Sequence, residues 1–152
     1  MSAFKGSYIH SIDKKGRINL PAKLRKFISP EANDTFIITR GFDQCIFAYP
    51  QDEWANYENA IRGLRSSSAD SRFVMRHLLQ YASEVQIDGQ SRIMLPQNLL
   101  QFAGIQSEAL ILGVLERIEI WNPDIYENYI KQQEATYEEV AEKVFQSNGI
   151  PT

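Results

Sequence analysis

One stretch of this chain occurs twice, and this repetition constrains the fold more than any other feature. Residues 12–28 read IDKKGRINLPAKLRKFI and residues 87–103 read IDGQSRIMLPQNLLQFA, at a fixed offset of 75 residues. Downstream, Ile46 and Tyr49 align with Ile118 and Trp121 after a three-residue slip. A duplication of this length predicts two copies of one supersecondary unit. Residues that differ between the copies must therefore be set by a requirement other than the shared fold.

Size and composition bound the class of protein. A chain of 152 residues can bury one good core or two small units that share an interface. No apolar run approaches the roughly 18 residues that span a bilayer, and the N-terminal segment lacks the order of a signal peptide. A single cysteine, Cys45, excludes an internal disulfide and a multi-cysteine metal site. We therefore expect a cytoplasmic protein with no membrane partner.

Charge is distributed unevenly along the chain. Residues 1–75 carry 11 basic and 8 acidic side chains, whereas residues 76–152 carry 5 and 11. Within residues 5–26, Asp13 is the one acidic residue among seven basic ones: Lys5, Lys14, Lys15, Arg17, Lys23, Arg25 and Lys26. A polyanionic partner would be attracted to this segment despite the net charge of −3. On charge alone, a solvated basic surface is an equally good interpretation.

Local patterns predict the same order of elements in each copy. In the first copy we expect a strand at 6–12, a turn at 13–16 and a strand at 17–20, together forming a hairpin with a basic tip. A short helix at 22–28, strands at 35–39 and 44–49, and a helix that starts at Tyr49-Pro50 follow. Residues 65–69 read as a linker, after which Asp70 is expected to cap a new helix.

The second copy should repeat this order. We expect a strand at 82–87, a turn at 88–91, a strand at 92–95, a helix at 97–103 and strands at 108–113 and 117–121. Asn122-Pro123 is expected to begin a closing helix. Thr136 and Glu139 have the spacing of a capping box, so that helix should break and restart there.

Four short strands cannot close a stable core alone, so the two copies are expected to form one pseudo-twofold unit. The predicted fold is α+β, with two tandem repeats making a small β-barrel with peripheral helices. The expected parts are a first repeat with its helix at 5–64, a linker and helix at 65–81, a second repeat at 82–145 and a flexible tail at 146–152.

Catalytic motifs are nearly absent from the sequence. It contains no nucleotide-binding glycine motif, no H-E-x-x-H and no G-x-S-x-G. His10 and His77 are isolated and read as surface or packing residues. Cys45 lies within an apolar strand and is expected to be buried and inert. We therefore expect no catalytic residue, no metal site and no cofactor, and an enzyme is disfavoured.

The repeated polar element is Asp-x-x-x-Arg: Asp13 with Arg17, and Asp88 with Arg92. Across a tight turn each aspartate can hold the loop through the guanidinium or the backbone, and Gly16 can adopt positive φ. The arginines allow two readings. They can be structural, or they can grip phosphate or guanine, because a two-stranded ribbon fits the major groove.

The copies differ most in basic charge. Between Asp and Arg the first has Lys-Lys-Gly and the second Gly-Gln-Ser, and Lys23, Arg25 and Lys26 align with Asn98, Leu100 and Gln101. The shared fold does not require this extra charge, which favours a nucleic-acid partner. The candidate DNA-binding residues are Lys14, Lys15, Arg17, Lys23, Arg25 and Lys26. Asp13, Gly16, Asp88 and Arg92 are candidate structural residues of the turns.

Five motifs resemble the MraZ family of bacterial proteins, which belongs with the AbrB/MazE-type swapped-hairpin DNA-binding folds. They are Phe4-Lys-Gly6, D-x-K-G-R-I at 13–18, Leu20-Pro21, Y-P-x-x-x-W at 49–54 and A-S-E-x-x-x-D-x-x-x-R-I at 82–93. The resemblance covers nearly the whole chain, and two such repeats in one chain are specific. One departure is Ser91, where a glycine is commonly found; together with the missing lysine it makes Arg92 the more structural arginine.

The resemblance implies a sequence-specific transcriptional regulator of its own operon, in the division and cell-wall gene cluster. It also implies ring-shaped homo-oligomers that bind short direct repeats in double-stranded DNA, in a nucleoid-associated protein without a small-molecule substrate. Carried over to this chain, DNA contact falls on Lys14, Lys15 and Arg17. Two alternatives stay open: an antitoxin-like protein-interaction module whose acidic C-terminal half holds a basic partner, and an enzyme with an unrecognised site.

Overall fold

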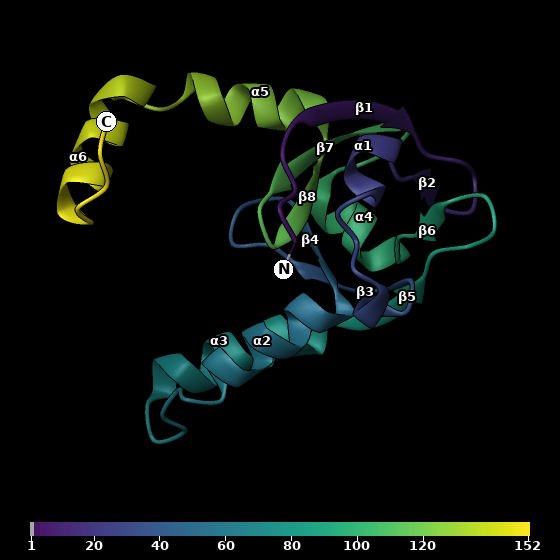
Figure 1. Cartoon of the computed structure of the whole chain (residues 1–152), viewed down its shortest axis with the longest axis horizontal. Helices are drawn as coiled ribbons and strands as arrows, with labels where there is room; N and C mark the ends of the chain where they lie inside the picture. Colours follow the sequence, from purple (N-terminus) through teal and green to yellow (C-terminus); the bar gives the residue numbers. More distant parts are fainter. Residues whose placement is uncertain (1) are drawn as a thin grey trace.

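The computed structural model describes residues 2–152 and has an α+β fold (Figure 1). Its first repeat contains β1 (Ser7–Ser11), β2 (Arg17–Asn19), α1 (Ala22–Arg25), a 3-10 turn (Pro30–Ala32), β3 (Thr35–Arg40), β4 (Ile46–Pro50) and α2 (Gln51–Ile61). Helix α3 (Ala69–Gln80) connects the repeats. The second contains β5 (Ser83–Gln86), β6 (Arg92–Met94), α4 (Gln97–Ala103), β7 (Glu108–Val114), β8 (Arg117–Trp121), α5 (Pro123–Lys131) and α6 (Tyr137–Ser147).

Strand pairing runs mainly between the two repeats rather than within them. The first strand of each repeat pairs with the third strand of the other, as β1 with β7 and β5 with β3. Strands β2 and β6 pair with each other, and so do β4 and β8. The six-stranded order β1-β7-β8-β4-β3-β5 is consequently the same when the repeats are exchanged. The duplication is therefore expressed as pseudo-twofold symmetry.

This topology corrects two details of the prediction. The turn after Ile12 is present, but the predicted pairing of its flanking strands is wrong. Among the described residues, one isolated bridge joins Ile12, the residue after β1, to Ile18 of β2, and β1 and β2 are not otherwise paired. In addition, β1 and β5 are the two ends of the sheet, and β2 with β6 forms a separate ribbon. Main-chain pairing thus does not close the sheet of the described chain into a barrel.

The main core lies where the ribbon and the two short helices cover the sheet. Equivalent residues of the two repeats fill it in pairs, because the apolar positions of both copies face inward. Ile18 and Ile93 have no exposed surface, and Leu24 on α1 and Leu99 on α4 are also buried. A second cluster, with Trp121 and Tyr49, lies beneath the other helices. Both repeats therefore contribute side chains to each of the two clusters.

Two helical arms extend from this body on the same side (Figure 1). Helices α2 and α3 form one arm, and α5 with α6 forms the other.

The predicted break before α6 is confirmed, and the Thr136 side chain accepts a hydrogen bond from the Glu139 N–H at 3.2 Å. The predicted cap of α3 is wrong. Helix α3 begins one residue before Asp70, and its capping side chain is Ser68, since only a residue outside the helix can accept from its free N–H groups.

Candidate nucleic-acid interface

Both Asp-x-x-x-Arg segments fold into the same tight turn. In the first, one oxygen of Asp13 accepts main-chain N–H groups of Lys15 and Arg17 at 2.9 Å each, and the other accepts Arg17 Nε at 2.7 Å. Asp88 makes the same contacts in the second turn, with Gln90 N, Arg92 N and Arg92 Nε at 2.9, 3.0 and 2.9 Å. Each carboxylate fixes both the loop and the direction of its arginine.

These hydrogen bonds also set the charge state of the turns. The main-chain N–H of Arg17 lowers the pKa of Asp13 below its usual 3.8, and the N–H of Arg92 does the same to the pKa of Asp88. Both aspartates are therefore ionised at neutral pH, and each offsets the charge of its own arginine. The surplus positive charge of the first turn comes from Lys14 and Lys15, which are exposed at its tip.

Each turn is fastened to the opposite repeat by a main-chain hydrogen bond. The N–H of Leu20 donates to the Ser91 carbonyl at 2.9 Å, and the N–H of Leu95 donates to the Gly16 carbonyl at 2.8 Å. Gly16 and Ser91 occupy equivalent positions and both have positive φ, 82° and 63°. The position where the second copy departs from glycine thus keeps the left-handed conformation that glycine favours.

The helices that support these turns differ between the repeats. Arg25 of α1 donates from Nη1 to the Ser91 hydroxyl at 2.9 Å and from Nε to the Leu20 carbonyl at 3.0 Å. Its counterpart Leu100 lies near Gly16, 3.2 Å from where a Cβ would be. The prediction treated all the additional basic charge as unnecessary for folding. The Arg25 guanidinium nevertheless joins the first repeat to the second turn, so this residue has a structural contact in addition to its predicted role in DNA binding.

The ribbon brings both motif arginines to one surface hollow. It is about 340 Å³ in volume and is lined by His10, Ser11, Ile12, Asp13, Arg17, Asn19 and Arg92. Arg92 Nη1 lies 4.0 Å from Asp13 Oδ2, because β6 runs antiparallel to β2 with Arg92 opposite Asn19. Within residues 2–152 the terminal nitrogens of Arg17 make no hydrogen bond to protein. Two arginines, each held by an aspartate, therefore border the same opening.

The other candidate cations lie on α1 or follow it. Lys23 and Lys26 are exposed, and Lys26 Nζ lies 5.1 Å from the centre of the Phe27 ring. Lys5 Nζ lies 5.5 Å from the same ring. The structure thus groups Lys5 with Lys26, while Lys14 and Lys15 stand at the turn. Their counterparts in the second repeat are uncharged, so the basic surface belongs to one repeat.

Six of the seven residues that line the hollow were not among the predicted DNA-binding residues, and His10, Asn19 and Arg92 are three of these six. The first two come from positions where the copies differ, because His10 aligns with Val85 and Asn19 with Met94. Comparing polarity between the copies at every position would have found them. Arg92 reaches the hollow through the register of β6 on β2, which is a long-range feature.

Other kinds of site find little support in the described chain. No group of three or more His, Cys, Asp or Glu side chains within residues 2–152 could hold a metal ion. Cys45 is buried, and burial raises the pKa of its thiol far above the usual value. No helix in the described part is long and apolar enough to cross a membrane.

Comparison with known proteins identifies the class and then the family. The family described as "MraZ protein, putative antitoxin-like" matches the chain twice, at residues 3–77 and 78–148. The chain is 43% identical over 141 residues to the transcriptional regulator MraZ of Natranaerobius thermophilus, covering 93% of this chain and 96% of that protein. At the same coverage it is 43% identical to the transcriptional regulator MraZ of Syntrophomonas wolfei and 40% identical to that of Desulforamulus reducens. This chain belongs to the MraZ family.

Proposed function

We propose that the protein is a DNA-binding transcriptional regulator of the swapped-hairpin type that acts on the promoter of its own operon. In this proposal it binds repeated promoter boxes as a ring-shaped oligomer and regulates a division and cell-wall gene cluster. One observation carries the proposal. The two Asp-x-x-x-Arg turns place Arg17 and Arg92 beside the same hollow, while Lys14 and Lys15, which the second copy lacks, are exposed at the turn of the first repeat.

The geometry of Arg17 suits recognition of a base edge. Its Nε donates to Asp13, which holds one edge of the guanidinium and leaves both terminal nitrogens available to a ligand. A guanidinium held in this way can donate two parallel hydrogen bonds to guanine O6 and N7, or to phosphate oxygens. Lys14 and Lys15, exposed next to it, would contact the backbone phosphates.

The remaining cations are assigned by their contacts. Lys23 and Lys26 on and after α1 make no ion pair in the described chain and would add phosphate contacts. Arg25 is assigned mainly to positioning, because both Nε and Nη1 already donate to protein oxygens. Through Ser91 it would keep the second turn, and therefore Arg92, at the edge of the hollow.

Self-association is part of the proposal for an energetic reason. A single turn offers about three phosphate contacts, and each contributes roughly −0.9 to the slope of log affinity against log salt. Such a site is weak alone. Several copies held in a ring and matched to repeated boxes would raise the overall affinity by about two to four orders of magnitude without any new contact.

The test is fluorescence anisotropy with labelled DNA from upstream of the protein's own operon. We expect wild-type protein to bind with a Kd of about 1 µM or tighter, Arg17→Ala to abolish binding and Arg92→Ala to weaken it less. Arg17→Lys should recover only the sequence-independent part of DNA binding, because an ammonium cannot donate two parallel hydrogen bonds as the planar guanidinium does. Lys131→Ala removes a cation on the acidic half and should leave the affinity unchanged. Full binding by Arg17→Ala would refute the assignment.

The antitoxin-like alternative predicts a different observation. The acidic α6 has no buried residue, so a basic protein could be its ligand. In that case a second polypeptide should co-purify with this protein in a fixed stoichiometry. It should be possible to remove that polypeptide without adding DNA as a competitor.

A further inference from the structure

Helix α6 ends the second arm and packs only slightly against its own chain, with Ala141 and Phe145 half-buried. None of its residues is buried. One side of the helix carries Tyr137, Val140 and Val144, and these side chains are 79%, 48% and 47% exposed. An isolated helix of 11 residues is marginal in water, and helices of this size normally owe their stability to a buried apolar face. The exposed face of α6 is therefore expected to be covered in the functional assembly.

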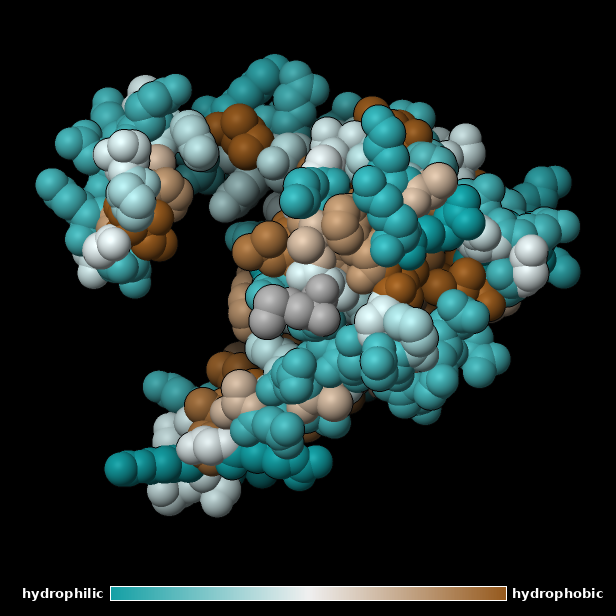
Figure 2. Space-filling model, viewed as in Figure 1, coloured by the Kyte–Doolittle hydropathy of each residue, from teal (hydrophilic) through white to brown (hydrophobic). Residues whose placement is uncertain are grey.

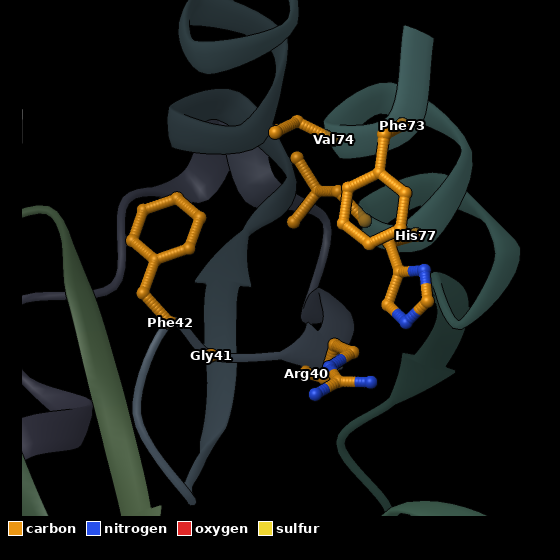
Figure 3. A pocket seen from close by; sticks show the side chains of 7 residues that line it. Arg40, Gly41, Phe42, Phe73, Val74 and His77 are labelled. Atoms are coloured by element: carbon orange, nitrogen blue, oxygen red, sulfur yellow. The ribbon is translucent and has the colours of Figure 1, made fainter. Parts of the chain in front are cut away.

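The other arm presents an apolar hollow. It lies between the β3–β4 loop and α3, has a volume of about 190 Å³ and includes Phe42, Phe73, Val74 and His77 in its lining (Figure 3). Phe42 and Phe73 are 71% and 64% exposed, and the Phe73 ring stacks on His77 at 4.9 Å between centres. Thr39 anchors the base of this arm by donating to the Leu78 carbonyl at 2.6 Å. The hollow is thus preformed on a fixed element.

The two apolar surfaces carry opposite charge. Residues 61–80 contain four arginines against Asp70, and residues 134–147 contain four glutamates against Lys143. Arg72 and Arg76 are four residues apart on α3, next to Phe73 and His77 in sequence. Glu138 and Glu142 are likewise four apart on α6, beside the apolar side. Residues four apart in a helix lie on one face, so each apolar stripe has a matching charged border.

We propose that α6 of one copy docks into the hollow between α3 and the β3–β4 loop of a second copy. This proposal rests on the self-association that forms part of the proposed function, and it names the interface. In Figure 1 the two arms leave the body on one side, and Figure 2 shows an open gap between the arms, with hydrophobic residues on both of them. Because the two surfaces differ, the contact is heterologous, and its repetition from copy to copy generates a ring when the rotation closes.

The test is a charge exchange read out as molar mass by light scattering over a dilution series. Glu138→Arg with Glu142→Arg, and Arg72→Glu with Arg76→Glu, should each raise the concentration at which the oligomer half-dissociates by about tenfold or more. Combining the four changes should restore the wild-type midpoint. Glu84→Arg with Glu116→Arg reverses two exposed charges elsewhere and should leave it unchanged. Since Arg72 also donates to the Ser66 carbonyl, Phe73→Ala is the second variant and should dissociate the oligomer without altering a hydrogen bond.

The outcomes separate this interface from the proposed function. Wild-type mass in both charge reversals and in Phe73→Ala overturns the interface, while the DNA-binding assay still stands. Failure of the four-residue combination to restore assembly also overturns it. A monomeric wild-type protein overturns the interface together with ring formation. Oligomers that dissociate as expected but never bind DNA support the interface and refute the regulator.

Discussion

Gly16 and Ser91 occupy the same place in the two turns but have different surroundings. A Cβ on Gly16 would lie 2.9 Å from the Leu95 carbonyl oxygen and 3.2 Å from Leu100, and its φ is +82°. We therefore expect Gly16→Ala to lower the free energy of unfolding by about 1–3 kcal/mol, measured by urea denaturation. Gly89→Ala in the other turn is the control. Its Cβ would meet nothing within 4 Å, so a change of about 0.5 kcal/mol or less is expected. Equal losses would contradict the strain assigned to Gly16.

The turn aspartates make stability depend on acid. The pKa of Asp88 is lower in the folded protein than its usual 3.8, chiefly because of the Arg92 N–H. Its contribution is thus fully present above pH 3.8 and is lost as the pH falls through the folded value. Asp88→Asn should be less stable than wild type at pH 7, and this difference should shrink below pH 3.8. Urea midpoints of both proteins, measured from pH 7 to pH 2.5, check this prediction. A difference in stability that stays constant with pH would show that folding does not stabilise the ionised form of Asp88.

At the scale of elements, the two outer helices depend differently on their caps. Asn122 accepts hydrogen bonds from the N–H groups of Asp124 and Ile125 and donates to the Gly104 carbonyl at 2.7 Å, so it attaches α5 to the end of α4. Asn122→Ala should cost about 1–2 kcal/mol in global unfolding. Thr136→Ala removes the equivalent cap of α6, which has no buried residue. In dilute, dissociated protein it should lower helicity but not global stability, by circular dichroism and denaturation respectively. A global loss as large as that of Asn122→Ala would indicate that α6 packs on its own chain.

The sequence was sufficient to locate the strands and helices but not to predict which strands pair with one another. Alternation, Pro21 and Pro96, and the turn residues located the strands and short helices to within three residues, because these signals are local. The partner of β2 is β6, about 75 residues away, and no local signal encodes that pairing. The same limit applies to Arg25, whose charge suggested DNA. Its bond to Ser91 spans 66 positions and becomes apparent only once the repeats exchange strands.

At the scale of the whole molecule, the two family matches do not correspond to two separable domains. Four of the six strand pairings join one repeat to the other, including the ribbon that places Arg17 and Arg92 at one hollow. The repeats also fill a common core, with Ile18 beside Ile93 in the central register of that ribbon. Folding and assembly of the candidate interface should therefore be one event.

Cutting the chain in the exposed loop between α2 and α3 tests this directly. Fragments 2–66 and 67–152 each lack the partners of four strands. Each fragment alone should therefore show no cooperative thermal unfolding as a monomer, because a few short strands without a second layer are not stable in water. Mixing the two should restore the native circular dichroism spectrum, together with DNA binding if the proposed regulator is correct. A fragment that pairs with itself should be a dimer, since the copies share their strand pattern, and light scattering will distinguish that case. A monomeric fragment with a sharp unfolding transition would instead mean that the duplicated unit is a domain, and that strand exchange follows its folding.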